Sequence, residues 1–168
     1  MGKQSKSKAK RKTSAWFRRH VHDPHVKRAE AEGRRSRAAF KLKEIMDRHG
    51  LHLKPDAVVV DLGCAPGSWC EEVARRLGKN GLLIGIDLLP VEPIADAILI
   101  QADFDSEDGL KAVEKALQGR DVHLVLSDMA PEMSGNKLVD QASMMNLNDL
   151  TLSFAVNHLR EGGHLLLK

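Results

Sequence analysis

The sequence has no tyrosine, only two cysteines and few aromatic residues of any kind, and none of its apolar runs approaches the length of a membrane span. Two cysteines, Cys64 and Cys70, are too few for a disulfide scaffold, so we expect both to be small core residues in a reducing compartment. No apolar stretch follows the basic N-terminus, which argues against a secretory signal. We therefore expect a cytoplasmic protein whose 168 residues form one domain with a substantial core.

The small net charge of +3 conceals two oppositely charged parts of the chain. Residues 1–50 contain 16 Lys and Arg against 5 Asp and Glu, whereas residues 51–168 contain 10 against 18. The resulting formal charges of +11 and −8 predict an acidic body with a basic arm that meets a polyanion. Nucleic acid is favoured over a solubilising tail, because the basic residues continue into a predicted helix that carries Lys41.

The basic part divides into two predicted segments. Residues 1–14 are expected to be disordered on their own, and residues 15–50 to form an arm and a helix that contact RNA. Three histidines between residues 20 and 25 resemble a metal cluster, but a solvated basic arm is the simpler interpretation, so we expect no metal. The helix is predicted over 34–49, where an apolar stripe ends at Gly50.

Strand and helix patterns alternate through the remaining segment, residues 51–168. Short apolar runs predict strands at 57–60, 82–86, 97–101, 122–126 and 164–168. Helical periodicity predicts helices at 69–77, 110–117 and 141–160, the last ending at Gly162-Gly163 and contributing Met144 and Met145 to the core. Such alternation is typical of an α/β domain, here a Rossmann-like fold whose mainly parallel sheet carries helices on both faces.

The most informative segment, Asp61-Leu62-Gly63-Cys64-Ala65-Pro66-Gly67-Ser68-Trp69, follows the first of these strands. A strand, a glycine turn and a helix in this order form a cradle for a nucleotide cofactor, because glycine lets the backbone approach the ligand. The dinucleotide fingerprint G-x-G-x-x-G does not fit, since position 65 is alanine and Pro66 has no amide hydrogen to offer a pyrophosphate. Gly63 and Gly67 therefore predict a site for a cofactor without a pyrophosphate.

Aspartates follow three further strands, and ligands of parallel sheets bind where the strands end. Asp87 is positioned to accept hydrogen bonds from ribose hydroxyls, and Asp103 from the exocyclic amine of an adenine. For each of them an ordinary capping aspartate is the alternative. Asp128, in Ser127-Asp128-Met129-Ala130-Pro131, is expected to face both the cofactor and whatever lies over the sheet edge; a loop or N-cap aspartate is its alternative.

Together these motifs resemble the FtsJ/RrmJ family of S-adenosylmethionine-dependent RNA 2′-O-ribose methyltransferases. The resemblance runs from about residue 14 to the end and rests on residues 35–42, 61–69, 87–90, 103–104, 127–131 and 167–168. It is closest to the bacterial branch that methylates a uridine ribose in large-subunit (23S) ribosomal RNA. The resemblance implies that S-adenosylmethionine is the cofactor, and that it is contacted by Gly67, Trp69, Asp87, Asp103 and Asp128.

The resemblance also implies a catalytic tetrad of lysine, aspartate, lysine and glutamate. Lys41, Asp128 and Lys168 match its first three members; the glutamate and two further strands have no counterpart, so we expect a chain shortened at its C-terminus. A ribose 2′-hydroxyl is a poor nucleophile that needs a base or a strong acceptor. We expect Lys168 to take its proton or steer its lone pair, Asp128 to hold Lys168, and Lys41 to position the ribose or the adjacent phosphate.

Four other functions are open to a chain of this kind. A catalytically impaired RNA-binding factor for ribosome assembly would accord with the missing glutamate, and a transfer RNA methyltransferase would share the catalytic centre. The basic arm disfavours a small-molecule methyltransferase, and the glycine turn disfavours an NAD-dependent oxidoreductase. We expect a monomer that acts on ribosomal RNA or the large ribosomal subunit, without a metal and without a membrane.

Overall fold

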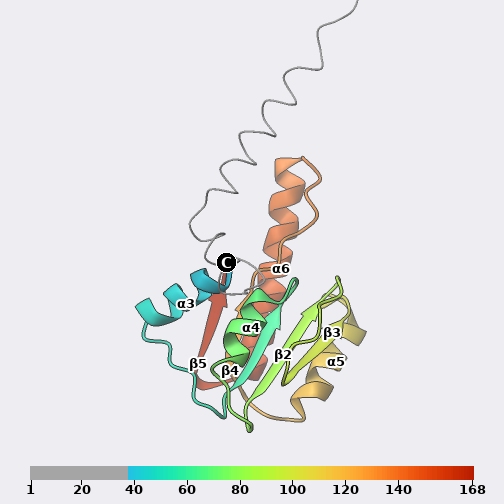
Figure 1. Ribbon diagram of the computed structural model, residues 1–168. Coiled ribbons are helices and arrows are strands. Elements are labelled where there is room, and N and C mark those ends of the chain that lie inside the picture. Colours follow the sequence, from blue (N-terminus) through green and yellow to red (C-terminus); the bar gives the residue numbers. More distant parts are fainter. Residues whose placement is uncertain (1–37) are drawn as a thin grey trace, which may run out of the picture.

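Five parallel strands form a single sheet in the computed structural model, which describes residues 38–168 (Figure 1). The strands are β1 (Val58–Leu62), β2 (Leu82–Asp87), β3 (Ala97–Gln101), β4 (Val122–Ser127) and β5 (Leu159–Leu167). They pair in the order β3-β2-β1-β4-β5, and all four pairings are parallel. The predicted Rossmann-like α/β fold is confirmed. The predictions for residues 1–37, including the disordered tail and the three histidines, lie outside the described residues.

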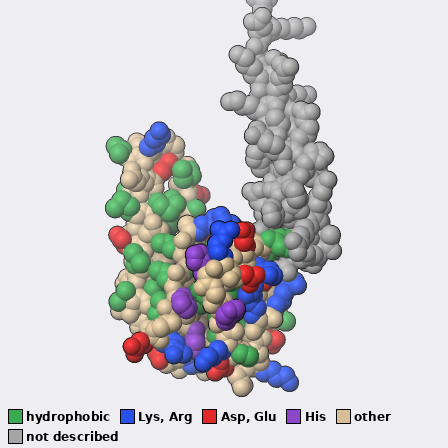
Figure 2. All heavy atoms as spheres, turned by 90° about the vertical axis from the view of Figure 1, so that its left-hand side faces the viewer, with side chains coloured by type: hydrophobic (Ala, Val, Ile, Leu, Met, Phe, Trp, Pro, Cys, Tyr) green, Lys and Arg blue, Asp and Glu red, His purple; other side chains and the backbone are tan. Residues whose placement is uncertain are grey.

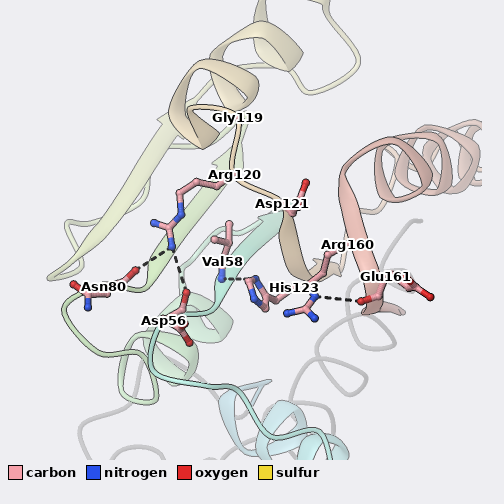
Figure 3. Close-up of a pocket in the computed structure, with 9 residues that line it drawn as sticks. All are labelled: Asp56, Val58, Asn80, Gly119, Arg120, Asp121, His123, Arg160 and Glu161. Carbon is pink, nitrogen blue, oxygen red and sulfur yellow. Dashed lines mark hydrogen bonds between the residues drawn. The ribbon is translucent and has the colours of Figure 1, made fainter.

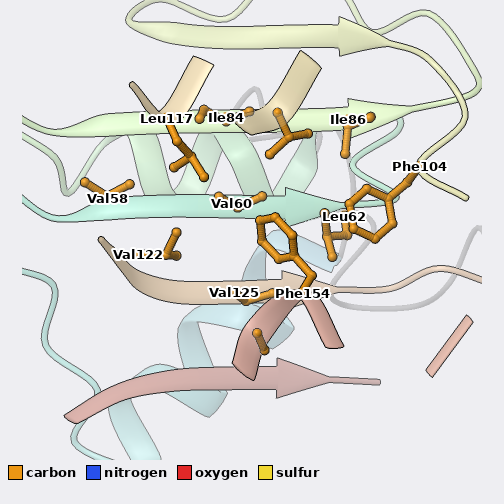
Figure 4. Packing of buried hydrophobic residues seen from close by; sticks show 12 residues of the cluster. Val58, Val60, Leu62, Ile84, Ile86, Phe104, Leu117, Val122, Val125 and Phe154 are labelled. Carbon is orange, nitrogen blue, oxygen red and sulfur yellow. The ribbon is translucent and has the colours of Figure 1, made fainter. Parts of the chain in front are cut away.

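Helices cover both faces of this sheet. Helices α3 (Ala38–Arg48) and α4 (Ser68–Ala74) pack on one face, and α5 (Glu107–Leu117) and α6 (Lys137–His158) pack on the other. Central strand β1 is buried along its whole length, as its uninterrupted apolar run predicts for a strand between two helical layers. Its side chains alternate between the layers: Val60 and Leu62 face α5 and α6 (Figure 4), whereas Val59 faces α3 and α4.

The end of the last helix and the start of the last strand differ from the sequence prediction. Helix α6 spans Lys137–His158 rather than 141–160, and β5 begins at once with Leu159 rather than at His164. Gly162-Gly163 does not stop a helix. The pair lies in an irregular part of β5, where two steps along β4 match five along β5, and Gly162 has a left-handed φ of 73°. Glycine permits this bulge, which depends on pairing with a distant strand.

The prediction that Met145 belongs to the core is wrong, and Met144 is only half-buried. Met145 is 58% exposed, and the buried side chains of α6 are confined to its second half, at Thr151, Phe154 and Ala155. A helix of 22 residues is about 33 Å long, whereas six-residue β4 extends about 20 Å. The first half of α6 therefore projects beyond the sheet, where Figure 1 shows it standing clear of the strands.

Two further features bear on function. No helix within residues 38–168 combines the length and the apolar character that crossing a bilayer requires. In the same residues, no three His, Cys, Asp or Glu side chains are grouped so that they could hold a metal ion.

The docking of α6 makes a first prediction. Phe154 is 3% exposed and packs edge-to-face on Phe104, with ring centroids 5.5 Å apart, whereas Val156 on the same helix is 81% exposed. Phe154→Ala is expected to lower the free energy of unfolding by about 3–5 kcal/mol, and Val156→Ala by less than about 0.5 kcal/mol. Urea denaturation measures both, and equal losses would contradict the docking described here.

Candidate functional site

The parallel register brings four predicted site residues into one row at the carboxyl edge of the sheet. Leu62, the last residue of β1, pairs with Ile86 of β2 on one side and with Ser127 of β4 on the other. Ser127 in turn pairs with Leu167 of β5. The residues that follow these positions are Asp87, Gly63, Asp128 and Lys168, in that spatial order. Residues up to 105 positions apart in sequence thus become neighbours.

An ion pair joins the last two members of this row. Lys168 Nζ lies 2.8 Å from both Asp128 Oδ1 and Asp128 Oδ2, so the carboxylate holds the ammonium with both oxygens. The backbone fixes both residues, since the amide of Lys168 donates to the carbonyl of Ser127 at 3.0 Å and that of Asp128 donates to the carbonyl of Leu62 at 3.4 Å. The two side chains are 48% and 34% exposed. The pair is therefore held in place but open to a large substrate.

Gly63 is required where the glycine turn meets the loop after β4. Its φ is +77°, and a Cβ at this position would lie 2.6 Å from Cγ of Met129 and 3.1 Å from its Cα. Any side chain would strain the backbone and push away the loop that carries Asp128. Gly67, with a φ of +97°, forms the N-cap of α4. The two glycines predicted from the turn thus have separate structural tasks.

Asp87 and Asp103 already make local hydrogen bonds. Asp87 Oδ2 accepts from the amide of Ala65 in the glycine turn at 2.9 Å, and Oδ1 accepts from the amide of Leu89 at 2.8 Å. Asp103 Oδ1 accepts from the amide of Asp105 at 3.0 Å. The capping alternative therefore describes part of what both residues do. A carboxylate oxygen accepts more than one hydrogen bond, so the predicted contacts with ribose and adenine stay predictions.

Two cavities flank the glycine turn and share Gly63, Ala65 and Asp128 in their walls. The larger, of about 380 Å³, lies on the side of β2 and is also lined by Asp87, Leu88, Leu89, Ala102, Phe104 and Met129. The smaller, of about 50 Å³, lies towards α3 and is also lined by Ala38, Asp61, Ser68 and Trp69. Adjoining cavities that share the catalytic aspartate candidate suit one elongated ligand with a bulky end and a small end.

Trp69 connects the turn to α3. Its side chain is 4% exposed, and its indole Nε1–H donates to the carbonyl of Ala38 at 3.1 Å. Lys41 lies one turn further along α3 and is exposed, with no ion pair to any other residue of 38–168. The structure therefore brings Asp128 and Lys168 into contact, and it places Lys41 on a helix that is tied to the turn.

A third hollow, of about 770 Å³, lies at the opposite edge of the sheet (Figure 3). Arg120 donates there to the backbone carbonyls of Asp56 and Asn80, and His123 Nδ1 accepts from the amide of Val58. These bonds fasten chain segments to one another. Its lining mixes acidic and basic side chains, and those of Arg120 and His123 are engaged in the fold, so the hollow shows nothing comparable to the Asp128–Lys168 pair.

Sequence reasoning assigned no role to Asp61, although the structure sets it apart. Its side chain is 1% exposed, Oδ2 accepts from Cys70 Sγ at 3.2 Å, and no donor within residues 38–168 reaches Oδ1. Burial raises the pKa of Asp61 to about 7; the Cys70 hydrogen bond opposes the rise, and the charges of Asp128 and Asp87 add to it. The one signal in the sequence is an acid inside an apolar strand.

The five-stranded parallel sheet with helices on both faces is a Rossmann-like fold of the kind found in methyltransferases. The profile of the FtsJ-like methyltransferase family matches residues 34–168, and the chain belongs to this family. FtsJ-family methyltransferases use S-adenosylmethionine.

Curated relatives agree with this assignment. The chain is 47% identical over 159 residues to "Ribosomal RNA large subunit methyltransferase E" of Janthinobacterium sp. (strain Marseille), covering 91% of this chain and 74% of that protein. It is 49% identical over 153 residues to the protein of the same name from Stenotrophomonas maltophilia (strain R551-3), covering 91% and 72%.

Solved structures match as well. A Plasmodium falciparum protein assigned as a ribosomal RNA methyltransferase superposes with a TM-score of 0.67 at 30% identity, covering 79% of this chain and 76% of that one. A short-chain dehydrogenase family protein from Francisella tularensis, at 15% identity and a TM-score of 0.50 over 67% and 50% of the two chains, shares the fold alone.

The close contact at Gly63 makes a second prediction. Gly119 has a nearly equal φ of +75°, but a Cβ at its position would meet no atom within 4 Å, so it serves as the matched control. Gly119→Ala is expected to cost about 1 kcal/mol of unfolding free energy from backbone strain alone. Gly63→Ala should cost clearly more, because Met129 must also move, and it should weaken binding of S-adenosylhomocysteine. Equal losses of stability in denaturant titrations would refute the contact.

The raised pKa of Asp61 makes a third prediction. Between pH 4 and pH 7 the folded chain keeps a proton on this carboxyl that the unfolded chain, with its ordinary value of 3.8, has lost. Stability contributed by this residue therefore falls as pH rises through that window, by on the order of a few kcal/mol. Asp61→Asn should remove this part of the decline, whereas Asn at exposed Asp121 should keep the parent profile. If the free energy of unfolding of the parent chain and of Asp61→Asn depends on pH in the same way from pH 4 to 8, the pKa of Asp61 is not raised.

Proposed function

We propose that this chain transfers a methyl group from S-adenosylmethionine to a ribose 2′-hydroxyl, with a uridine of large-subunit (23S) ribosomal RNA as acceptor. The observation that carries the proposal is the Asp128–Lys168 ion pair, fixed by the backbone next to the glycine turn and open to solvent. Family membership supports the reaction class, and the name shared by the curated relatives supports ribosomal RNA as the acceptor.

The described residues fit such a donor. Gly63 lies against Met129 so closely that a Cβ cannot be accommodated, and the cavities on its two sides differ in size as the two ends of S-adenosylmethionine do. We assign Asp87, Ala102 and Phe104 to the adenosine side, with Asp103 beyond them, and Gly67 and Trp69 to the amino-acid side. When bound, the donor supplies a methyl group on a sulfonium, so the protein's main task is alignment.

Catalysis is assigned to Lys168, Asp128 and Lys41. As the new C–O bond forms and the S–C bond breaks, the 2′-hydroxyl loses its proton. Lys168 takes that proton when its side chain is a neutral amine; as the ammonium of the ion pair it steers the oxygen lone pair towards the methyl carbon while the proton passes to solvent. Asp128 holds Lys168 with two oxygens, which removes the rotational freedom of a long side chain before the acceptor arrives. Lys41, exposed and without an ion pair inside residues 38–168, is available to the ribose or its phosphate.

An RNA partner accords with the distribution of charge. In Figure 2, which faces the side of the molecule where Figure 1 places α3 and β5, Lys, Arg and His side chains lie over the lower part of the described surface, with Asp and Glu side chains among them. Residues 1–50 add a formal charge of +11 to a chain whose remainder is acidic. Phosphate contacts of such a surface depend on salt, because they release counterions. We assign the chain to the cytoplasm, where ribosomal RNA is met, and to a monomeric state.

A fourth prediction tests the base. Lys168→Ala is expected to reduce methyl transfer by at least about 100-fold while leaving the dissociation constant of S-adenosylhomocysteine within about 2-fold. Lys111→Ala, on the outer surface of α5, is the control and should leave both quantities unchanged. Transfer of a labelled methyl group to large ribosomal subunits measures the first quantity, and calorimetry the second. Full turnover of Lys168→Ala would overturn the assignment.

A fifth prediction tests the acceptor. Deleting residues 1–33, which contain ten Lys and Arg, should weaken methyl transfer to RNA and flatten its dependence on salt. Binding of S-adenosylhomocysteine should persist. The parent chain is assayed with large ribosomal subunits, free 23S ribosomal RNA and transfer RNA. Methyl transfer to transfer RNA alone would show that the proposed acceptor is wrong. RNA binding without methyl transfer would favour a ribosome-assembly factor.

A further inference from the structure

The end of α6 that extends beyond the sheet carries exposed apolar side chains. Leu138 is 79% exposed and Val139 is 50% exposed, and Met133 in the preceding loop is 73% exposed. Because α6 begins after the end of β4 and ends where β5 starts, its first half lies on the same side of the sheet as the Asp128–Lys168 pair (Figure 1). We call Met133, Leu138 and Val139 the apolar tip.

Hydrogen bonds hold the loop before α6 in one conformation. Asp140 Oδ1 accepts from both the amide and the hydroxyl of Ser134 at 2.7 Å, and the side chain of Asn136 accepts from the amide of Leu138 at 3.1 Å. The bonds from Ser134 lower the pKa of Asp140, so this carboxylate stays ionised and engaged. Met133 and Leu138 are thus presented in fixed positions, which spares an incoming ligand the cost of ordering them.

The apolar tip is continuous with the candidate site. Its loop leaves β4 at Asp128 and lines the cavity of about 380 Å³ through Met129, Ala130 and Glu132. Met133 follows directly, five residues after Asp128, so the two Cα atoms are at most about 18 Å apart. A nucleic acid whose ribose meets Asp128 therefore brings only the nucleotides next to that ribose within reach of the tip.

The charge of this part of the chain determines which surface of a nucleic acid fits it. Residues 129–147 contain one cation, Lys137, against two acids, Glu132 and Asp140. Phosphates are bound by Lys and Arg, so a segment with a formal charge of −1 does not attract the backbone of RNA. The faces of the bases are the apolar surface that RNA offers, and they are accessible where the strand is unpaired and unstacked.

We propose that the apolar tip packs against an unstacked nucleobase beside the acceptor nucleotide, so that the site takes its RNA as a single strand. This inference rests on the proposed function and names the state of the RNA that the site accepts. Apolar side chains inserted beside a base also separate it from its neighbours in the stack. Met133 and Leu138 are positioning residues, because they orient the strand and touch no reacting atom.

The test measures the binding of two probes to the full chain: a short single-stranded oligouridine, and the same strand paired with oligoadenosine. The double variant Met133→Ser, Leu138→Ser should bind the single strand about 5- to 10-fold more weakly and the duplex within about 2-fold of the parent chain. Because base contacts release no counterions, the salt dependence of binding should not change. Val156→Ser, at an equally exposed position on the docked half of α6, is the matched control and should change neither affinity.

All three substituted positions are exposed, so the variants should keep the parent's midpoint of urea denaturation. Equal weakening of the two probes, or undiminished binding of the single strand, would overturn the proposal.

Methyl transfer gives a second measurement. The double variant should raise KM for free 23S ribosomal RNA and leave kcat and the dissociation constant of S-adenosylhomocysteine within about 2-fold. A defect with large ribosomal subunits that appears with neither free 23S ribosomal RNA nor the oligouridine would overturn the proposal in favour of a contact with a ribosomal protein. A parent chain that methylates no RNA would refute the proposed function, whereas the comparison of the two probes still decides the role of the tip.

Discussion

The parallel register between β1 and β4 is the constraint on which the rest of the site depends. Leu62 and Ser127 end their strands opposite each other, so the turn that follows one and the loop that follows the other leave the sheet side by side. Gly63 then lies within contact distance of Met129, and Asp128 reaches its ion pair with Lys168 because β5 continues the same register. A slip of one residue would turn every one of these side chains to the opposite face.

Most of the sheet was predictable because its strands are short apolar runs bounded by polar residues. Strand β3 has the predicted bounds; β2 and β4 each extend one residue further than predicted, and β1 begins one residue later and ends two residues later. The junction of α6 and β5 was not predictable, since Gly162-Gly163 has the local character of a helix stop. Its actual role is set by pairing with β4, some forty residues earlier in the chain.

The residues of the candidate site were likewise predictable from sequence only in part. Aspartates at strand ends could be found from sequence, because parallel strands end at one edge whatever their order. Asp61 could not be interpreted, since its meaning lies in the absence of a partner for Oδ1 among residues 38–168, in a cavity formed by the glycine turn together with α3. The prediction for Met145 was wrong for a different reason. Helix α6 is longer than the sheet that it covers, and the periodicity of apolar residues does not show where a helix extends past the sheet.

The hydrogen bond between Trp69 and Ala38 has a consequence for how such a site changes over evolutionary time. One indole N–H joins the helix that presents Lys41 to the turn between the two cavities. In the proposed function, substitutions on the outer surface of α3 change contacts with the acceptor without breaking this hydrogen bond, whereas substitutions beneath it disturb donor and acceptor together. The Trp69–Ala38 hydrogen bond therefore divides the residues of the proposed site into two groups. Residues on the outer surface of α3 can be substituted one at a time as the acceptor changes, whereas the residues beneath the bond have to change together.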